Sequence, residues 1–189
     1  EKIKDIAESI DKEIKIEFIK SFYNEPEYID ALCSLIKKNR IEDSDLLLFS
    51  YHGIPLRHLK KAKGKSNNGY YCSNAWCPSK EYCYRHQVYE TSRLCAEKLN
   101  IPKEKWQVSF QSRIGPGWLK PFTDEVLKEL PDKGIKKVDV ICPSFVIDNL
   151  ETLEEISIEG RHDFLAAGGE KFNYIPVSYT HLTLPTTLS

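Results

Sequence analysis

The chain has 189 residues, and its 27 Lys and Arg against 28 Asp and Glu give a formal net charge of −1. A nearly neutral chain is a poor candidate for a nucleic-acid-binding protein, because phosphate backbones are bound by an excess of basic side chains. The sequence contains no run of about 18 apolar residues, the length of a membrane-spanning helix, and its first ten residues lack the apolar segment of a signal peptide. We therefore expect a cytoplasmic protein with one globular domain and without nucleic acid as a partner.

The first part of the chain alternates between helical and extended patterns. Apolar residues recur at helical spacing over 3–10, and apolar and charged residues alternate over 14–18 as in a strand. Asn24, followed by a glutamate and a proline, predicts the start of a helix that it caps and that runs to residue 38. Residues 46–49 are an unbroken apolar run, which is typical of a strand covered on both faces.

A turn over 51–55 and a basic, cysteine-rich insertion over 57–83 follow this strand, and we expect the insertion to be mostly loop. The elements expected next are a helix over 81–100, a strand over 106–110, a helix over 123–130, a strand over 138–142, a helix over 150–167 and a strand over 172–175. This alternation predicts an α/β fold, a doubly wound parallel sheet with helices on both faces.

Two residues stand out at the carboxyl ends of the expected strands, where ligands bind in sheets of this type. His52 follows the buried strand and precedes a glycine, so its neutral imidazole can accept a proton or bind a metal at this edge. Glu151 opens a helix that follows another strand. Other interpretations stay open: a turn histidine bonded to backbone, and a carboxylate that is stabilised by the helix macrodipole whatever its function.

Several short motifs strengthen the functional interpretation. They are SYHGIP at 50–55, SFQSR at 109–113, WLKP at 118–121, CPSFV at 142–146, LETLEEI at 150–156, EGR at 159–161 and YIP at 174–176. In this order they resemble the C-terminal half of a bacterial ferrochelatase, the enzyme that inserts ferrous iron into protoporphyrin IX to form protohaem. The resemblance covers residues 13–176.

The resemblance implies a three-layer αβα domain, chelatase-like, that is one of two similar halves with the porphyrin between them. It implies that His52 and Glu151 face ferrous iron as the catalytic pair. Fe²⁺ is then a substrate whose oxidation state does not change, so the reaction needs no nucleotide. The expected substrate-binding residues are Tyr51, Gln111, Ser112, Arg113 and Trp118.

The chemistry of metallation agrees with an imidazole and a carboxylate at the metal. Two pyrrole N–H protons must leave the porphyrin as the metal enters, and an imidazole with the reference pKa of about 6.5 is mostly unprotonated at pH 7. A nearby carboxylate can hold the resulting imidazolium or assist the incoming cation. Whether His52 takes the proton, hands over the metal or does both stays open at this point.

The ends of the chain depart from the family pattern. The sequence has no Met, even at position 1, so we expect a fragment whose partner is the missing N-terminal half of the same enzyme. We expect residues 1–176 to form the ferrochelatase-like domain and residues 177–189, which carry no Asp, Glu, Lys or Arg, to be an unrelated or disordered tail. The basic residues of the insertion, Arg57, Lys60, Lys61, Lys63 and Lys65, are expected to form a solvated loop. Contact with porphyrin propionates or with an anionic membrane surface is the alternative.

Three cysteines lie close together in the insertion, at Cys72, Cys77 and Cys83. In a chain without a secretory signal, such thiols favour metal or cluster ligation over disulfides, and their spacing matches no standard zinc site. Some bacterial ferrochelatases carry a [2Fe–2S] cluster in an internal insertion, so the resemblance implies a cluster here. We expect Cys95 as the fourth ligand; free surface thiols are the alternative.

Two other functions are compatible with the same pattern. A cobalt chelatase or another tetrapyrrole chelatase has a similar fold and a similar His/Glu pair. A non-catalytic α/β domain that binds a small molecule also uses paired halves. The wording of the motifs around His52 and Glu151 favours iron insertion.

Overall fold

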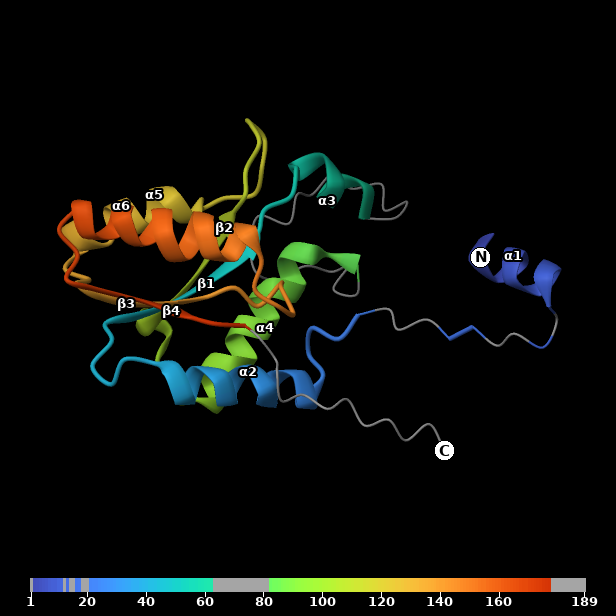
Figure 1. Cartoon of the computed structure of the whole chain (residues 1–189), viewed down its shortest axis with the longest axis horizontal. Coiled ribbons are helices and arrows are strands. Elements are labelled where there is room, and N and C mark those ends of the chain that lie inside the picture. The colour runs from blue at the N-terminus through green and yellow to red at the C-terminus, as the bar shows by residue number, and fades with distance from the viewer. Residues whose placement is uncertain (1, 12, 14–15, 18–20, 63–81, 178–189) are drawn as a thin grey trace.

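The structure, a computed structural model, describes residues 2–11, 13, 16–17, 21–62 and 82–177. The elements in chain order (Figure 1) are α1 (Lys2–Ile10), α2 (Pro26–Asn39), β1 (Leu46–His52), α3 (Leu56–Ala62), α4 (Tyr84–Lys98), η2 (Lys103–Lys105), β2 (Trp106–Gln111), α5 (Thr123–Glu129), η3 (Pro131–Lys133), β3 (Lys137–Ile141), η4 (Glu151–Gly160), α6 (Arg161–Ala166) and β4 (Lys171–Ile175).

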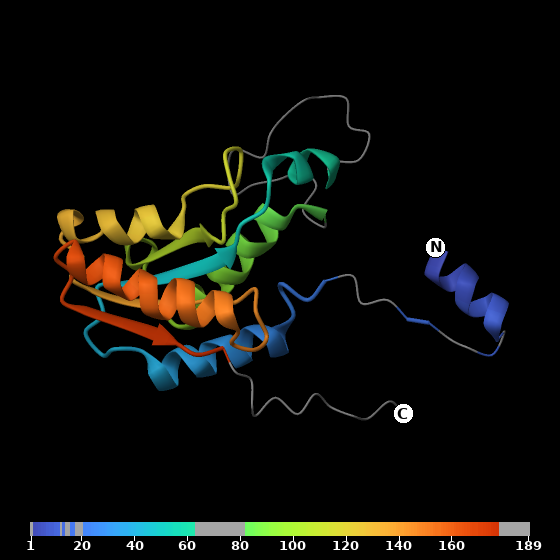
Figure 2. The same cartoon turned by 45° about the horizontal axis from the view of Figure 1, so that its top comes forward.

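A four-stranded sheet with the order β2-β1-β3-β4 forms the middle layer, and all its neighbouring pairs are parallel. Helices α2 and α4 cover one face, and α5, η4 and α6 cover the other (Figures 1 and 2). The expected doubly wound α/β architecture is thus confirmed. Because the strands are parallel, their carboxyl ends meet at one edge of the sheet.

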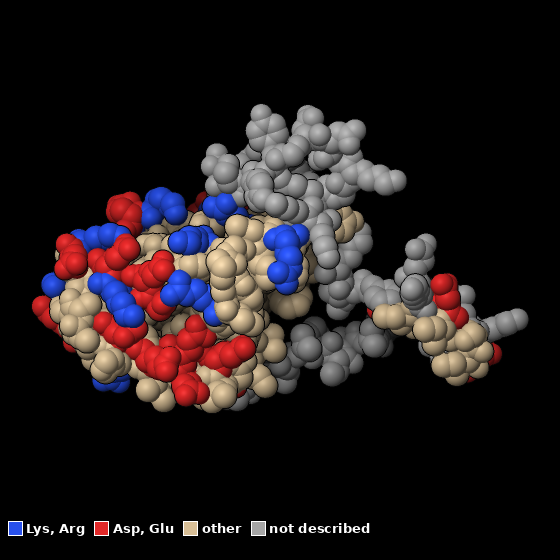
Figure 3. Space-filling view, turned by 90° about the horizontal axis from the view of Figure 1, so that it is seen from above, with Lys and Arg blue, Asp and Glu red and all other residues tan. Residues whose placement is uncertain are grey.

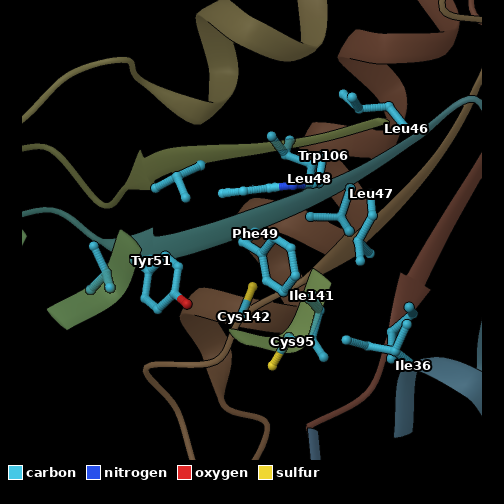
Figure 4. Close-up of a cluster of buried hydrophobic side chains, with 14 of the residues drawn as sticks. Ile36, Leu46, Leu47, Leu48, Phe49, Tyr51, Cys95, Trp106, Ile141 and Cys142 are labelled. Carbon is cyan, nitrogen blue, oxygen red and sulfur yellow. The ribbon is translucent and has the colours of Figure 1, made fainter. Parts of the chain in front are cut away.

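Strand β1 lies at the centre of the core. Leu47, Leu48 and Phe49 are fully buried, as the unbroken apolar run predicts for a strand with helices on both faces. Figure 4 shows these side chains with Ile36 of α2 and Trp106 of β2 around them. This packing fixes the position of β1, and therefore of its carboxyl end, between the two helical layers.

Several local expectations need correction. The helix α2 is preceded by Glu25 as its N-cap, with Pro26 first in the helix and no side-chain cap hydrogen bond, so Asn24 is not the cap. A short helix, α3, occupies the start of the segment that was expected to be loop. The strand expected over 14–18 falls mostly outside the described residues, and Ile16 and Glu17 are not in a strand.

Two further differences concern the functional edge. Strand β1 extends through His52, where a turn was expected, because it pairs with β2 as far as His52 and Gln111. The helix expected over 150–167 consists of a π-helix, η4, that continues directly into α6. π-Helical turns are rare and are frequent at functional sites.

In the part of the chain that the structure describes, no helix has both the length and the apolar character needed to cross a bilayer.

Gly53 offers a test of the packing at this edge. A Cβ at this position would lie 2.8 Å from the Gln111 carbonyl oxygen and 3.3 Å from Cε3 of Trp118. Since the first of these contacts is with backbone, we expect Gly53→Ala to lower the free energy of unfolding by about 1–3 kcal/mol in urea titrations. Gly115→Ala is the matched control, because a Cβ there meets nothing within 4 Å; an equal effect of both substitutions would contradict this packing.

Candidate active site

His52 and Glu151 meet at the carboxyl edge of the sheet. His52 is the last residue of β1, and Glu151 is the first residue of η4. Nε2 of His52 lies 3.8 Å from Oε1 of Glu151, and the two side chains are 37% and 49% exposed. The structure therefore brings together an imidazole and a carboxylate that are far apart in the sequence, and it leaves both accessible from solvent.

The orientation of the His52 ring follows from a second contact. Nδ1 lies 2.6 Å from the carbonyl oxygen of Gly53, and a carbonyl oxygen can only accept a hydrogen bond. The neutral ring therefore carries its proton on Nδ1, and the lone pair of Nε2 is directed to the side of Glu151. This tautomer presents a free base at the edge of the sheet.

The start of η4 is fixed by side chains that precede it. Asn149 and Thr152 bond reciprocally: the Asn149 N–H donates to Thr152 Oγ1 at 3.0 Å, and the Thr152 N–H donates to Asn149 Oδ1 at 3.2 Å. The Asp148 carboxylate accepts hydrogen bonds from the Tyr174 hydroxyl and from the Val177 N–H. These contacts satisfy backbone donors at the helix start, as a capping box does, and hold Glu151 at the edge.

Gln111 contacts the main chain of Glu151 from the core. Its side chain is 2% exposed, its Oε1 accepts from the Ser50 hydroxyl at 2.8 Å and from the Cys142 thiol, and its Nε2 donates to the Glu151 carbonyl oxygen at 3.3 Å. Ser50 also contacts Thr123 of α5. The polar atoms of Gln111 thus have protein partners inside the core, and its expected role in substrate binding stays a prediction.

Tyr51 does not lie beside His52 in the site. Neighbouring residues of a strand point to opposite faces, and Tyr51 is buried against α4, where its hydroxyl contacts Ser92 at 2.9 Å. Figure 4 shows it among the core side chains near Cys142. Burial raises the pKa of Tyr51 well above its usual value. Tyr51 is therefore a core hydroxyl in this structure, and its expected role in substrate binding stays a prediction.

Ser112 and Arg113 follow β2 on the side of the sheet that carries α5. The Ser112 N–H and hydroxyl both donate to the Glu155 carboxylate, at 2.6 and 2.7 Å. Arg113 donates to Asp124 and Glu125, each at 2.8 Å. Figure 3 shows acidic and basic side chains intermingled over this face, which α5, η4 and α6 form.

Trp118 lies directly over the turn that follows His52. The Leu119 N–H donates to the Ile54 carbonyl oxygen at 3.0 Å, which ties the Trp118 segment to the turn. A Cβ on Gly53 would lie 3.3 Å from Cε3 of Trp118. Trp118 is half-buried, so its indole lies against the residue that follows His52.

An exposed apolar group borders the same pair. Its members, here called the apolar rim, come from the loop after β3 and the start of η4: Val146, Ile147, Leu150 and Leu153, all exposed. The ring of Phe145, in the same loop, has its centroid 6.2 Å from that of His52. Exposed apolar side chains grouped beside polar ones are typical of a surface that binds a ligand or a partner.

The cysteines do not converge as expected. Cys72 and Cys77 lie outside the described residues, while Cys83 is buried and immediately precedes α4. Cys95 is fully buried on α4, against Cys33, and twelve residues of helix separate it from Cys83, a distance of about 18 Å along the axis. Cys95 is therefore not placed to share one cluster with Cys83, and that expectation is corrected.

Among the described residues there is no group of three or more His, Cys, Asp or Glu side chains that could hold a metal ion. The His52–Glu151 pair offers two metal-binding groups at the sheet edge. Such a pair suits an ion that passes through the site with further ligands from elsewhere, because a stable metal site normally takes four or more ligands.

Two residues that bond to the main chain of His52 were not predicted from the sequence. The Tyr84 hydroxyl donates to the His52 carbonyl oxygen at 2.8 Å, and the His52 N–H donates to Ser144 Oγ at 3.0 Å. Ser144 belongs to the quoted CPSFV motif, directly after a strand, so its position at the edge could have been inferred. Tyr84 follows the insertion and carries no comparable signal.

Comparison with known proteins identifies the family. A family model described as Ferrochelatase matches residues 1–188. The chain is 47% identical to a protein named ferrochelatase from Coxiella burnetii (strain Dugway 5J108-111). The match extends over 171 residues, which are 86% of this chain and 47% of the relative. For the ferrochelatases of Pseudomonas fluorescens (strain Pf0-1) and Opitutus terrae the identity is 41%, over 50% and 49% of those proteins. The chain spans about half the length of the curated relatives it matches, and it belongs to the ferrochelatase family.

Proposed function

We propose that this chain supplies the His52–Glu151 pair of a ferrochelatase active site, which inserts Fe²⁺ into protoporphyrin IX. The observation that carries the proposal is the 3.8 Å approach of Nε2 to Oε1 at the open edge of the sheet. Membership of the family supports it, because the similar relatives are named ferrochelatase. The activity belongs to the whole protein, to which this chain contributes one half.

The roles of the two residues follow from their geometry. Nε2 of His52 has a free lone pair, so it can take a proton from a pyrrole nitrogen of the bound ring. The imidazolium that forms then lies beside the Glu151 carboxylate, which stabilises its positive charge. Fe²⁺ replaces two protons on the porphyrin nitrogens, so charge balances without any change of oxidation state.

The surface around the pair has the character that a porphyrin requires. The macrocycle is flat and apolar with anionic propionates at one side. The apolar rim and Trp118, which lies against Gly53, offer apolar surface close to His52. Of the expected substrate-binding residues, Trp118 and the exposed Arg113 stay in the proposal, Trp118 against the ring and Arg113 toward a propionate.

The remaining partners belong to the same proposal. Residues 1–176 form the ferrochelatase-like domain, and the missing N-terminal half of the enzyme covers the other side of the porphyrin. The basic insertion begins on α3, where Arg57 is exposed. We propose a cytoplasmic protein that contacts the inner face of the membrane through this insertion.

The test for His52 uses the chain fused to the N-terminal half of the Coxiella burnetii relative. We expect His52→Ala to lower the rate of Fe²⁺ insertion into protoporphyrin IX by about 10²- to 10⁴-fold, the usual contribution of a general base, while porphyrin binding, followed by fluorescence, persists. His58→Ala, an exposed histidine of α3, is the control. Unchanged metallation in His52→Ala would exclude this mechanism. In the unsubstituted fusion, preferential insertion of Co²⁺ would favour a cobalt chelatase. Porphyrin binding without any metallation by that fusion would favour a non-catalytic binding domain.

Glu151 gives a second prediction on the same fusion. Glu151→Gln keeps the size of the side chain and removes the charge beside the imidazolium, so we expect metallation to slow by about tenfold, which corresponds to about 1.4 kcal/mol of lost stabilisation. Glu154→Gln, three residues further along η4 and exposed, is the matched control. Equal rates for the two variants would remove Glu151 from the mechanism.

The cysteine segment is tested separately. We propose that Cys72, Cys77 and Cys83 hold a [2Fe–2S] cluster whose fourth ligand is not Cys95, so anaerobically purified protein should be coloured and contain acid-labile sulfide. Cys83→Ser should abolish both signals, and Cys95→Ala should retain them. A colourless protein without labile sulfide means that these residues are free thiols.

A further inference from the structure

The main chain of His52 has an unusual position in the sheet. In an extended strand, the N–H and C=O of one residue point to the same side, and those of the next residue point to the other. The Gly53 N–H donates to the Gln111 carbonyl oxygen at 2.8 Å, toward β2. The N–H and C=O of His52 therefore face the side of β3.

On that side the sheet has already ended. Pairing between β1 and β3 stops at Phe49 and Ile141, three residues before His52. Without other partners, both polar groups of the His52 main chain would be left unpaired at the most critical position of the site, at a cost comparable to lost hydrogen bonds.

Two hydroxyls take the place of the missing strand. The His52 N–H donates to Ser144 Oγ at 3.0 Å, and the Tyr84 hydroxyl donates to the His52 carbonyl oxygen at 2.8 Å. Both polar groups of the His52 main chain are therefore paired, the N–H with the Ser144 hydroxyl and the C=O with the Tyr84 hydroxyl.

We propose that Tyr84, together with Ser144, is a positioning residue that fixes the orientation and tautomer of His52. The proposal rests on the proposed function only for its catalytic consequence. The peptide unit between His52 and Gly53 is held from both sides, by Tyr84 at its C=O and by Gln111 at its N–H. This unit ends at the Cα of Gly53, and the carbonyl group on that Cα accepts from Nδ1 of the ring, 2.6 Å away, so holding the unit also restrains the partner of the ring.

Tyr84 is suited to this task. It is the first residue of α4, whose packing against α2 and β2 makes a rigid base. Burial raises the pKa of Tyr84 to about 12, so the phenol remains protonated and continues to donate throughout the neutral pH range. The cysteine segment ends at Cys83, so Tyr84 is the first residue after it in the chain.

The test reads the His52 ring directly, in the chain as it stands. Nitrogen NMR on histidine-labelled protein distinguishes the two neutral tautomers, and the His52 signals are assigned by their loss in His52→Gln. We expect the Nδ1–H tautomer alone in the unsubstituted chain, and a shift of the tautomer ratio by roughly tenfold in Tyr84→Phe, the factor that corresponds to one buried hydrogen bond. Tyr89→Phe removes a hydroxyl from the same helix, where the ring contacts Arg85, and should change nothing.

Ser144→Ala removes the hydroxyl that accepts from the His52 N–H and should shift the ratio in the same direction. If Tyr84→Phe does not fold, the result for Ser144→Ala decides the proposal. An unchanged ratio in the folded variants overturns the proposal. In the metallating fusion, Tyr84→Phe should lower kcat by about tenfold and leave KM for porphyrin unchanged. If the fusion does not metallate at all, the proposed function fails, while the NMR result still decides the role of Tyr84.

Discussion

The unequal pairing of the central strand is the constraint on which the site depends. Strand β1 pairs with β2 through His52 but with β3 only as far as Phe49. The last three residues of β1 therefore extend past one neighbour while they remain held by the other. Side chains from α4, α5 and the loop after β3 form hydrogen bonds there. Because these side chains bond where a neighbouring strand would otherwise pair, polar groups gather at this edge of the sheet.

A buried polar network lies beneath that edge and serves a structural purpose. Ser50, Gln111 and Thr123 are almost fully buried, and their polar atoms bond to one another and to Ser109. Burial of such groups costs free energy unless each finds a partner, so the network is stable only when complete. It joins β1, β2 and α5, and through the Glu151 carbonyl oxygen it also fixes the start of η4. The same bonds that stabilise the sheet edge therefore set the distance between His52 and Glu151.

The sequence predicted much of this frame, because its strongest signals are local. The apolar run at 46–49 and the alternation of helices and strands predicted the sheet, and the parallel topology predicted that His52 and Glu151 meet at one edge. Tyr51 and Gln111 could not be placed the same way. Their burial depends on which face of β1 points to α4 and on where β2 ends. Both features are set by the register between strands rather than by residues that are adjacent in the sequence. Tyr84 is recognisable only once β3 is known to stop short of His52.

The exposure of the His52–Glu151 pair shows why a covering ligand matters for its chemistry. Two opposite charges about 4 Å apart attract by about 1 kcal/mol in water and by about 4 kcal/mol at the effective dielectric constant of a protein surface. In this chain the pair lies open to solvent beside the apolar rim. A flat macrocycle seated on the rim and on Trp118 would exclude water from one side of the pair. The carboxylate then stabilises an imidazolium most strongly when a porphyrin is present to give up its proton, so under the proposed function binding of the substrate itself strengthens the interaction that metallation requires.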